Sequence, residues 1–370
     1  MRVERLEYEG FRNLETGSIQ PVPEVNILYG QNGQGKTNLL ESIWFFTGGR
    51  SFRGAKDSDT VGFGQEKASL KMDFFAQDRS QQAEINIEKR RSASLEGISL
   101  PSATHLAGTF CAVVFSPAHL TLIKDGPDGR RRFLDAAYCQ LRPGYMRVLA
   151  EYQRILTQRN ALLKNIRNGQ RAEGLEIWDE RLAEAGARVF AARTAYIRKM
   201  TPAVKNIYSG ISGGKENIEI EYSSAAGDIS VLPEEARQRL LSLLKENVCV
   251  DTEAGFTTIG PHRDDLVVDI DGKAARFFAS QGQQRSAVLA LKLAEASVLK
   301  QVTGEQPVAL LDDVMSELDP ARQDYVLNHI HGWQVFLTCC DPSPVMKMNG
   351  GRVFHVDKGR ITDMTSERGV

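Results

Sequence analysis

Short runs of apolar or alternating residues, separated by turn residues, dominate the first third of the chain, and this pattern is typical of β-strands. The sequence predicts strands over 3–11, Val25–Tyr29, 67–75, 82–88 and Ala112–Phe115. An apolar helical pattern follows the second of these strands. The first part of the chain is therefore predicted to have an α/β fold with many strands.

From about residue 130 the apolar positions recur every three or four residues, which is typical of amphipathic helices. Two such helices, on either side of Asn168-Gly169, are predicted to form an antiparallel hairpin, and Pro202 is expected to end or kink the second one. Further along, the pattern predicts a strand over 217–222, a helix over 233–244, a hairpin over 267–278 that turns at Asp271-Gly272, a long helix through Leu299, and a helix that begins at Pro320.

The composition excludes few classes of function. With 370 residues the chain can bury a large core and is expected to divide into two lobes. The net charge is −1, so any attraction to an anionic partner must come from local patches. Five cysteines without metal-ligand spacing are expected to be reduced thiols that act as small apolar residues. No signal-peptide segment and no apolar run of about 18 residues are found, so we expect a cytoplasmic protein without membrane contact.

The segment Gly30-Gln31-Asn32-Gly33-Gln34-Gly35-Lys36-Thr37 fits the phosphate-binding pattern G-x-x-x-x-G-K-[ST]. It lies between a predicted strand and a predicted helix, which is the context that this loop requires. Glycines let the backbone N–H groups converge on a phosphate chain, and the following helix directs the positive end of its dipole at the same anion. Lys36 is expected to reach the β- and γ-phosphates of ATP, and Thr37 to ligate Mg²⁺.

Two later segments add to this picture. Ser280 and Gln283 have the spacing of a capping box, and taken alone they indicate only the start of a helix. Val308–Leu311 reads as a buried strand that ends in two carboxylates, where α/β sheets place their ligands. Asp312 is expected to hold Mg²⁺, and Asp313 to orient and deprotonate an attacking water.

Taken together and in this order, the segments resemble the ATP-binding-cassette ATPases, most closely their SMC-like branch and within it the RecF family of gap-repair proteins. The residues that carry the narrower resemblance are Phe11-Arg12-Asn13-Leu14, Tyr29 to Gly33, Gly129 to Asp135, Gly260-Pro261-His262-Arg263-Asp264-Asp265, Leu311 to Val314 and Glu317-Leu318-Asp319. The resemblance implies an α/β fold of the ABC-type ATPase head, with a mixed sheet around the phosphate loop and a second, largely helical lobe. Residues 1–125 and 302–370 are expected to form the ATP-binding lobe. Residues 126–301 are expected to form the second lobe, which contains the signature motif, Ser280 to Gln283, and the helical arm, the two helices on either side of Asn168-Gly169.

The resemblance also implies roles for individual residues. The catalytic group would be Lys36, Asp312 and Asp313, with Thr37 and Asp312 as metal ligands. Nucleotide contacts outside the phosphate loop would come from Arg12, Asn13, Asn38, Ser280, Gly282, Gln283 and Thr338. Ser280 and the N–H of Gly282 would face the γ-phosphate on a second copy of the chain, so ATP would become part of a homodimer interface.

Three positions depart from the wider cassette pattern. Asp313 stands where a Glu is usual, which suggests slow hydrolysis because its side chain is shorter. The histidine that transporters carry after the next strand is absent, and Thr338 takes its place. The segment 116–119 lies where a glutamine loop belongs, without a glutamine.

The resemblance implies an ATP-dependent clamp that dimerises on double-stranded DNA near single-strand gaps and is released by weak, DNA-stimulated hydrolysis. Its setting would be DNA replication, recombinational repair and the SOS response, on gapped or single-stranded DNA, with RecO and RecR as partners in loading the recombinase. Two other functions stay open from the residues alone. A small-molecule P-loop kinase is disfavoured because it has no use for a signature helix, and a transporter's nucleotide-binding subunit is disfavoured by the absent histidine.

Evidence for nucleic-acid binding from the residues themselves is weaker. A basic stripe accumulates along the first arm helix and could contact phosphates without reading sequence, although a charge run is usually a solvated face. The stripe comprises Arg142, Arg147, Arg154, Arg159, Lys164, Arg167 and Arg171, with Arg130-Arg131-Arg132 just before it. Lys89-Arg90-Arg91 is expected at a hairpin tip. His262-Arg263 is expected either in a solvated Gly-Pro turn or in a lobe-coupling or DNA-binding role.

Overall fold

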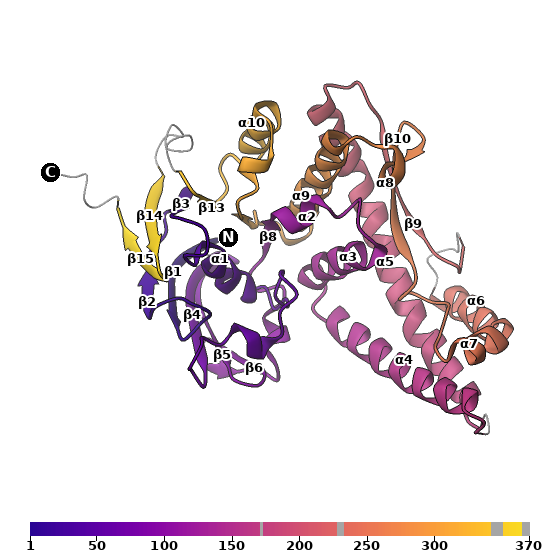
Figure 1. Cartoon of the computed structure of the whole chain (residues 1–370). Helices are drawn as coiled ribbons and strands as arrows, with labels where there is room; N and C mark the ends of the chain where they lie inside the picture. Colours follow the sequence, from indigo (N-terminus) through magenta and orange to yellow (C-terminus); the bar gives the residue numbers. More distant parts are fainter. Residues whose placement is uncertain (171–172, 228–232, 342–350, 365–370) are drawn as a thin grey trace.

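The computed structural model describes residues 1–170, 173–227, 233–341 and 351–364. Within these ranges the chain forms three β-sheets and a set of helices that gather on one side of the molecule (Figure 1). The central sheet has six strands in the order β15-β14-β3-β13-β12-β8. These strands are β3 (Val25–Tyr29), β8 (Ala112–Phe115), β12 (Val308–Leu311), β13 (Val335–Cys339), β14 (Arg352–Asp357) and β15 (Arg360–Asp363).

The register of the central sheet brings the ends of its parallel strands to one edge. β3, β13, β12 and β8 run parallel, with Tyr29 opposite Cys339 and Leu311 opposite Phe115. Their carboxyl ends therefore meet at a single edge, where α/β proteins bind ligands. β14 also runs parallel to β3, whereas β15 is antiparallel to β14, so the sheet is mixed as predicted.

Alternating residues of each central strand face two different hydrophobic cores. Val308 and Leu310 of β12 pack with α1 (Lys36–Phe45) and the second sheet. Ala309 and Leu311 pack on the opposite side with α9 (Gln281–Thr303). A strand that is buried on both faces must be apolar throughout, which explains the unbroken apolar run that predicted it.

The second sheet is antiparallel and covers α1 from the other side. Its order is β2-β1-β4-β5-β6-β7. In its longest strands alternate residues are buried, so one face packs on the core and the other faces outward. The elements are β1 (Arg2–Glu9), β2 (Gly17–Ile19), β4 (Ala68–Ala76), β5 (Arg79–Ile87), β6 (Arg91–Leu95) and β7 (Ile98–Ser99), with the short 3-10 helices Asp57–Thr60 and Ala103–Leu106 beside them.

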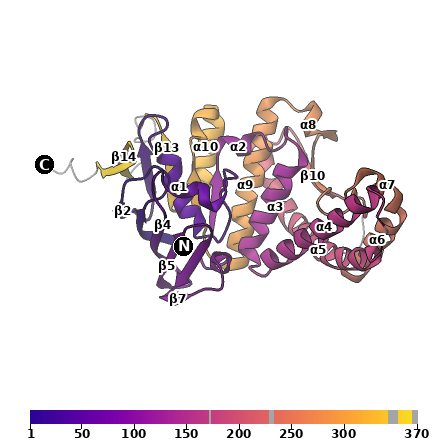
Figure 2. The same cartoon turned by 60° about the horizontal axis from the view of Figure 1, so that its bottom comes forward.

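The helical part is built on one very long helix. α5 (Leu175–Ser212) packs against α4 (Tyr145–Arg167), α6 (Pro233–Glu246) and α9. Figures 1 and 2 both show α4 and α5 lying along each other, with α6 and α7 (Val248–Ala254) near their far end, so the predicted helical hairpin is confirmed. The other elements of this part are α2 (Pro117–Leu120), α3 (Pro127–Leu141), α8 (Ala275–Phe278), α10 (Pro320–His329) and the third sheet, β9 (Ile218–Ser223), β10 (Asp265–Ile270) and β11 (Lys273–Ala274).

Two expectations about this part hold only in part. α5 does not end at Pro202 but continues for ten further residues to Ser212. A proline inside a helix costs about 3 kcal/mol, and the packing of α5 against three other helices outweighs that cost. The hairpin expected over 267–278 does turn at Asp271-Gly272, between antiparallel strands. Its second strand has only two residues, Lys273 and Ala274, because the chain then enters α8.

The cysteines and the helices agree only partly with the expectations from composition. All five cysteines are free thiols, and Cys111 and Cys139 are buried as expected for small apolar residues. Cys249 and Cys340 are exposed, so the expectation was wrong for these two. Among the helices that the structure describes, none is both long and apolar enough to cross a bilayer.

A buried arginine connects α4, α5 and α7 through ion pairs. Arg159 of α4 donates to Asp179 of α5 and to Asp251 of α7, both at 2.6 Å, and to the hydroxyl of Thr257 at 2.8 Å. Its side chain is fully buried. Breaking a buried ion pair leaves the other charges uncompensated, so this cluster fixes how three helices meet.

We predict that Arg159→Ala destabilises the protein by about 3–5 kcal/mol, because two buried carboxylates are left without their partner. Arg154→Ala, at an exposed position earlier on the same helix, should change the stability by less than about 0.5 kcal/mol. Urea unfolding followed by circular dichroism checks both variants. Equal unfolding midpoints for the two variants would show that the cluster contributes nothing particular to stability.

Candidate nucleotide-binding site

The segment between β3 and α1 curls around the side chain of Lys36. The Lys36 ammonium donates to the carbonyl oxygens of Gly30 and Gln31, at 2.9 Å in the case of Gln31. Only 7% of Lys36 is exposed. An ammonium group has three donors. Within the described residues one of them therefore stays available to an anion held by the loop.

Gly35 is the N-cap residue of α1, and its backbone conformation favours glycine. Its φ of +120° is one that L side chains rarely adopt. A Cβ at this position would also lie 2.9 Å from Oδ1 of Asn13. The unpaired N–H groups of the first turn of α1 and the positive end of its dipole are thereby directed at the loop, which favours a bound anion.

The two acidic residues after β12 lie beside this loop. Thr37 Oγ1 donates a 2.7 Å hydrogen bond to Asp312 Oδ1, and Thr338 Oγ1 donates to the same oxygen at 3.1 Å. Burial raises the pKa of the Asp312 carboxyl, and the neighbouring Asp313 carboxylate adds to the rise, whereas the two threonine hydrogen bonds lower it. The sheet register explains the arrangement, because β12 and β13 are adjacent strands.

Asp313 has a different environment from Asp312. Its backbone has a φ of +49°, which is uncommon for a residue other than glycine, and its N–H donates to Thr338 Oγ1 at 2.8 Å. Ser316 Oγ donates to its carbonyl oxygen at 2.8 Å. Asp313 lines the cavity over the phosphate loop together with Thr338. Asp312 is thus buried against Thr37, whereas Asp313 is half-buried and lines the cavity.

That cavity has a volume of about 880 Å³. Its wall combines the phosphate loop, the segment after β1 and the turn before β4. It is lined by Gly10, Arg12 to Thr16, Asn32 to Asn38, Arg53, Asp59, Val61 to Phe63, Gln65, Asp313 and Thr338. Most residues expected to contact nucleotide therefore share one cavity. The exceptions, which do not line it, are Gly30, Gln31, Asp312, Ser280, Gly282 and Gln283.

Arg12 and Asn13 reach this cavity by different contacts. The Arg12 guanidinium makes two hydrogen bonds, of 2.9 and 3.1 Å, to the buried carboxylate of Glu41 in α1. Asn13 donates to the carbonyl of Gly33 at 3.2 Å and accepts from Asn38 at 2.7 Å. The expected nucleotide contacts thus also hold the loop and α1 in place. Sequence reasoning missed Arg53, which donates to Asn38 Oδ1 at 2.8 Å, since no motif includes it.

The donor set fits a small, hard divalent cation. Thr37 and Asp312 present a hydroxyl and a carboxylate oxygen 2.7 Å apart at the end of the phosphate loop. Mg²⁺ takes oxygen ligands and is usually bound by one or two protein groups together with substrate phosphates and water. These two residues could therefore hold Mg²⁺ against a nucleotide.

The signature segment, residues 280–283, lies at a different cavity. Ser280 Oγ accepts from the N–H of Gln283 at 3.2 Å, and Gln283 accepts in return from the Ser280 N–H at 2.8 Å, which confirms the capping box. Ser280 and Gln283 line a hollow of about 390 Å³ with Lys215, Glu216 and other residues. None of the described residues 280–283 lines the cavity over the phosphate loop.

Two arginines connect the signature segment to the loop after Asp313. Arg322 of α10 donates to the Gly282 carbonyl at 3.0 Å and to Ser286 Oγ at 2.8 Å, and it also pairs with Asp319. Arg285 donates to Glu317 at 2.8 Å. The sequence gives no signal for the contacts of Arg285 with Glu317 and of Arg322 with Gly282 and Ser286, because these partners lie more than thirty residues apart.

The basic stripe of the arm is shorter than expected. Arg159 is buried in its ion pairs and cannot contact DNA, because its donors are directed at two buried aspartates. Arg130 is also buried, paired with Asp265. Arg147 and Arg154 remain exposed along α4, as do Lys164 and Arg167. Arg142 precedes α4, and Arg171 lies outside the described residues.

The segment 260–265 is a structural anchor of the helical part. Tyr152 of α4 donates to Nδ1 of His262 at 2.6 Å, and the Nε2 of that ring lies 3.0 Å from the Thr257 carbonyl oxygen. Burial lowers the pKa of His262 to about 4. Tyr222 donates to Asp264 at 2.8 Å. The interpretation of His262 as a solvated turn residue was therefore wrong, although Arg263 is exposed.

Comparison with known proteins identifies the family. Residues 2–362 match the model of the RecF/RecN/SMC N-terminal domain. A relative from Acetivibrio thermocellus, named DNA replication and repair protein RecF, is 37% identical over 356 residues, which cover 95% of this chain and 96% of the relative. A relative of the same name from Clostridium acetobutylicum is 37% identical over 367 residues, covering 98% and 100% of the two chains.

Solved structures agree with the sequence comparisons. A structure of the recombination mediator protein RecF with ATP in the RecFOR pathway matches with a TM-score of 0.90 and 36% identity, covering 98% of this chain and 97% of that one. An Smc head bound to the C-winged helix domain of ScpA matches over 100% of both chains with a TM-score of 0.55 and 16% identity, which shows a shared fold alone. The fold is that of an SMC-like ATPase head with a helical lobe, and the chain belongs to the RecF family of DNA replication and repair proteins.

Proposed function

We propose that the chain is an ATP-dependent DNA clamp of recombinational repair, in which ATP joins two copies on duplex DNA near single-strand gaps. The observation that carries this proposal is the separation of two half-sites. The phosphate loop and the acidic pair line one cavity, whereas the signature segment lies at another. The two half-sites of one chain therefore cannot serve the same nucleotide, and a second copy would complete each of them. The proposed lobes are residues 1–125 with 302–370 and residues 126–301.

ATP binding would use the contacts described above. The backbone of Gly30 to Gly35 and the free donor of Lys36 surround the phosphates, while Arg12, Asn13 and Asn38 hold the wall of the cavity. Mg²⁺, bound by Thr37 and Asp312, would neutralise charge on the β- and γ-phosphates. The RecF structure with ATP supports this assignment, since it shares 36% of its residues with this chain.

Hydrolysis would depend on Asp313. Its carboxylate faces the cavity and can accept the proton of a water aimed at the γ-phosphate. An aspartate reaches less far than a glutamate, so we expect weak hydrolysis that DNA stimulates by closing the dimer. Thr338 holds the backbone of Asp313 and would contact the γ-phosphate from the position of the missing histidine.

Dimerisation would place the signature segment of one copy over the nucleotide of the other. Ser280, the Gly282 N–H and Gln283 would then contact the γ-phosphate across the interface. Because the nucleotide binds the closed state, it stabilises the dimer by about 3 to 4 kcal/mol at 100 to 1,000 times its Kd.

The DNA contacts would come from the exposed cations of α4, chiefly Arg147 and Arg154. Contacts to phosphates hold duplex DNA without reading its sequence. In the proposed pathway the clamp marks gaps with single-stranded DNA and, with RecO and RecR, helps to load the recombinase in the SOS response. The RecFOR pathway named for the solved relatives supports these partners.

Lys36→Ala should abolish ATP-dependent dimerisation, because the buried loop cation that faces the phosphates contributes roughly 2–5 kcal/mol to binding. Light scattering with and without ATP measures the dimer fraction. Lys245→Ala, at an exposed lysine on α6, is the control and should dimerise like the parent. A normal dimer fraction for Lys36→Ala would remove the phosphate-loop assignment.

Asp313→Asn should keep ATP binding and the dimer but slow hydrolysis by about 10²–10⁴-fold, since an amide positions water yet cannot accept its proton. Asp324→Asn, at an exposed carboxyl on α10, should hydrolyse ATP normally. Phosphate release measured with duplex DNA present compares the two. Parent-like turnover by Asp313→Asn would place the base elsewhere.

Replacing Arg147 and Arg154 together with Gln should weaken duplex DNA binding equally on unrelated sequences. The slope of log affinity against log salt should become shallower by about 0.9 for each phosphate that these side chains no longer neutralise. Titrations of two labelled duplexes at several salt concentrations, with ATP, measure this. Lys245→Gln with Lys300→Gln is the matched control. An unchanged slope moves the DNA site off α4, and a parent that binds no DNA refutes the clamp.

A further inference from the structure

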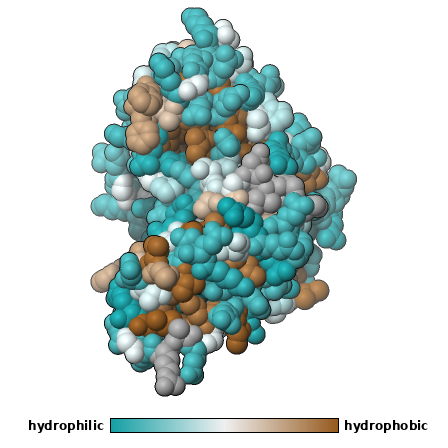
Figure 3. Space-filling model, turned by 90° about the vertical axis from the view of Figure 1, so that its right-hand side faces the viewer, coloured by the Kyte–Doolittle hydropathy of each residue, from teal (hydrophilic) through white to brown (hydrophobic). Residues whose placement is uncertain are grey.

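Two adjacent phenylalanines lie exposed directly before the signature segment. Phe277 and Phe278 of α8 are 72% and 71% exposed. Large apolar side chains seldom stay this exposed in neighbouring positions unless they contact a partner. The face of the helical part in Figure 3 is mostly hydrophilic, with apolar side chains in separate patches. Phe277 and Phe278 differ from the other large exposed apolar residues outside the arm in being adjacent in the chain.

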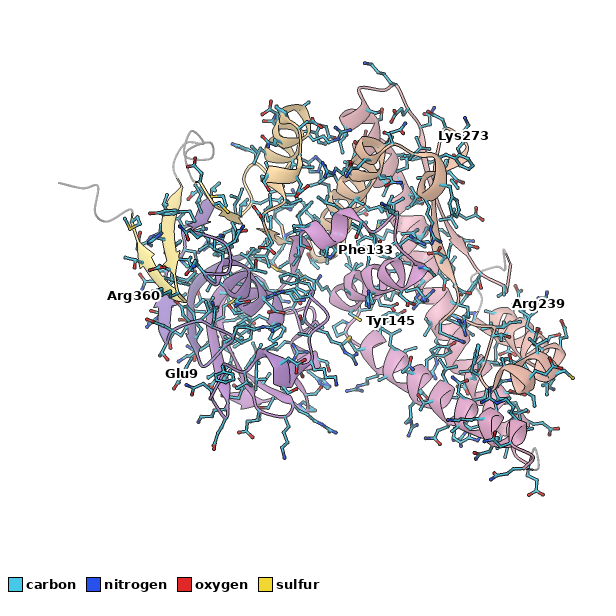
Figure 4. All side chains as sticks on the ribbon, in the orientation of Figure 1. Glu9, Phe133, Tyr145, Arg239, Lys273 and Arg360 are labelled. Carbon is cyan, nitrogen blue, oxygen red and sulfur yellow. The ribbon has the colours of Figure 1, made fainter. Side chains whose placement is uncertain are left out.

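The pair is held rigidly. Ala275, which begins α8, is fully buried, and its carbonyl accepts from Gln284 of the signature helix α9 at 3.1 Å. The two rings contact each other edge to face, with centroids 6.5 Å apart. Figure 4 shows Lys273, just before α8, at the outer end of the β10–β11 hairpin. The aromatic pair thus lies close to Ser280, which follows Phe278 by two residues.

A third exposed phenylalanine lies at the nucleotide cavity. Phe63 is completely exposed and lines the cavity over the phosphate loop. It occupies a tight turn in which Gln65 N–H donates to the Gly62 carbonyl at 3.0 Å, and Gly64 has a φ of +76°. Gly62 N–H donates to the Gly10 carbonyl at 2.7 Å, which fixes this turn on the cavity wall.

The two features cannot serve the same nucleotide within one chain. Figures 1 and 2 both place α8 on the helical side of the molecule, away from α1 and the phosphate loop. The proposed dimer, however, brings the signature segment of one copy onto the cavity of the other. The aromatic pair next to the signature segment and Phe63 at the cavity would then both be buried in the dimer.

We propose that Phe277 and Phe278 pack against the Phe63 rim of the nucleotide cavity on a second copy of the chain. This contact rests on the proposed ATP-dependent dimer and extends it beyond the phosphates. It couples dimer closure to apolar burial at the outer end of the cavity. A two-fold symmetric dimer makes the contact twice, so each substitution acts at two places.

Phe277→Ser with Phe278→Ser tests the contact. With ATP, the dimer dissociation constant should rise at least about tenfold, because several exposed aromatic faces stay in water. ATP affinity at protein concentrations that keep the chain monomeric should stay at the parent value. Phe277→Leu with Phe278→Leu should restore most of the dimer. Ile177→Ser with Val250→Ser, two exposed apolar positions on the arm, is the matched control and should dimerise normally.

Phe63→Ser tests the other side of the proposed contact. It should also weaken the dimer, and combining it with the Phe277 and Phe278 substitutions should add little, since both changes remove the same interaction. Fully additive effects, or a parent-like dimer for the Phe277 and Phe278 variant, overturn the contact while leaving the clamp intact. A normal dimer with weakened DNA binding would assign the pair to DNA instead. A parent that stays monomeric with ATP overturns both the clamp and this contact.

Discussion

The candidate nucleotide site depends on a contact between two segments that lie far apart in the sequence. Thr37 Oγ1 and Asp312 Oδ1 lie 2.7 Å apart although 275 residues separate them in the chain. They meet because β13 pairs with both β3 and β12, so the ends of all three strands reach the same edge. Without that register, the loop cation, the candidate metal ligands and the candidate base would belong to separate parts of the molecule.

The same strands separate the interior into two cores with different tasks. The core on the α1 side supports the phosphate loop and the antiparallel sheet, in which β1 leads into the segment that contains Arg12. The core on the α9 side supports the signature helix. Arg285 and Arg322 connect the two sides of the site, because they bind the loop after Asp313 to the first turns of α9. These contacts connect the segment after the acidic pair to the signature helix.

Local signals in the sequence predicted the parts that depend on neighbouring residues. β3, β8 and β12 have the predicted bounds, because a strand buried on both faces needs an unbroken apolar run. The capping box at Ser280 depends on a spacing of three residues and was predictable too. The burial of Arg159 was not, because its partners lie 20 and 92 residues away. The continuation of α5 past Pro202 was not predictable for a similar reason, since the packing that keeps this helix continuous comes from distant helices.

The strand order of the central sheet also affects how the chain reaches its fold during synthesis. β3 emerges early, yet its two neighbours in the sheet, β13 and β14, begin at residues 335 and 352. Pairings of such long sequence separation form slowly and leave apolar strand edges exposed in the meantime. The nascent phosphate loop thus has no flanking strands until synthesis is nearly complete, and a chain that ends shortly before β13 would lack the strand that brings Thr37 and Asp312 together.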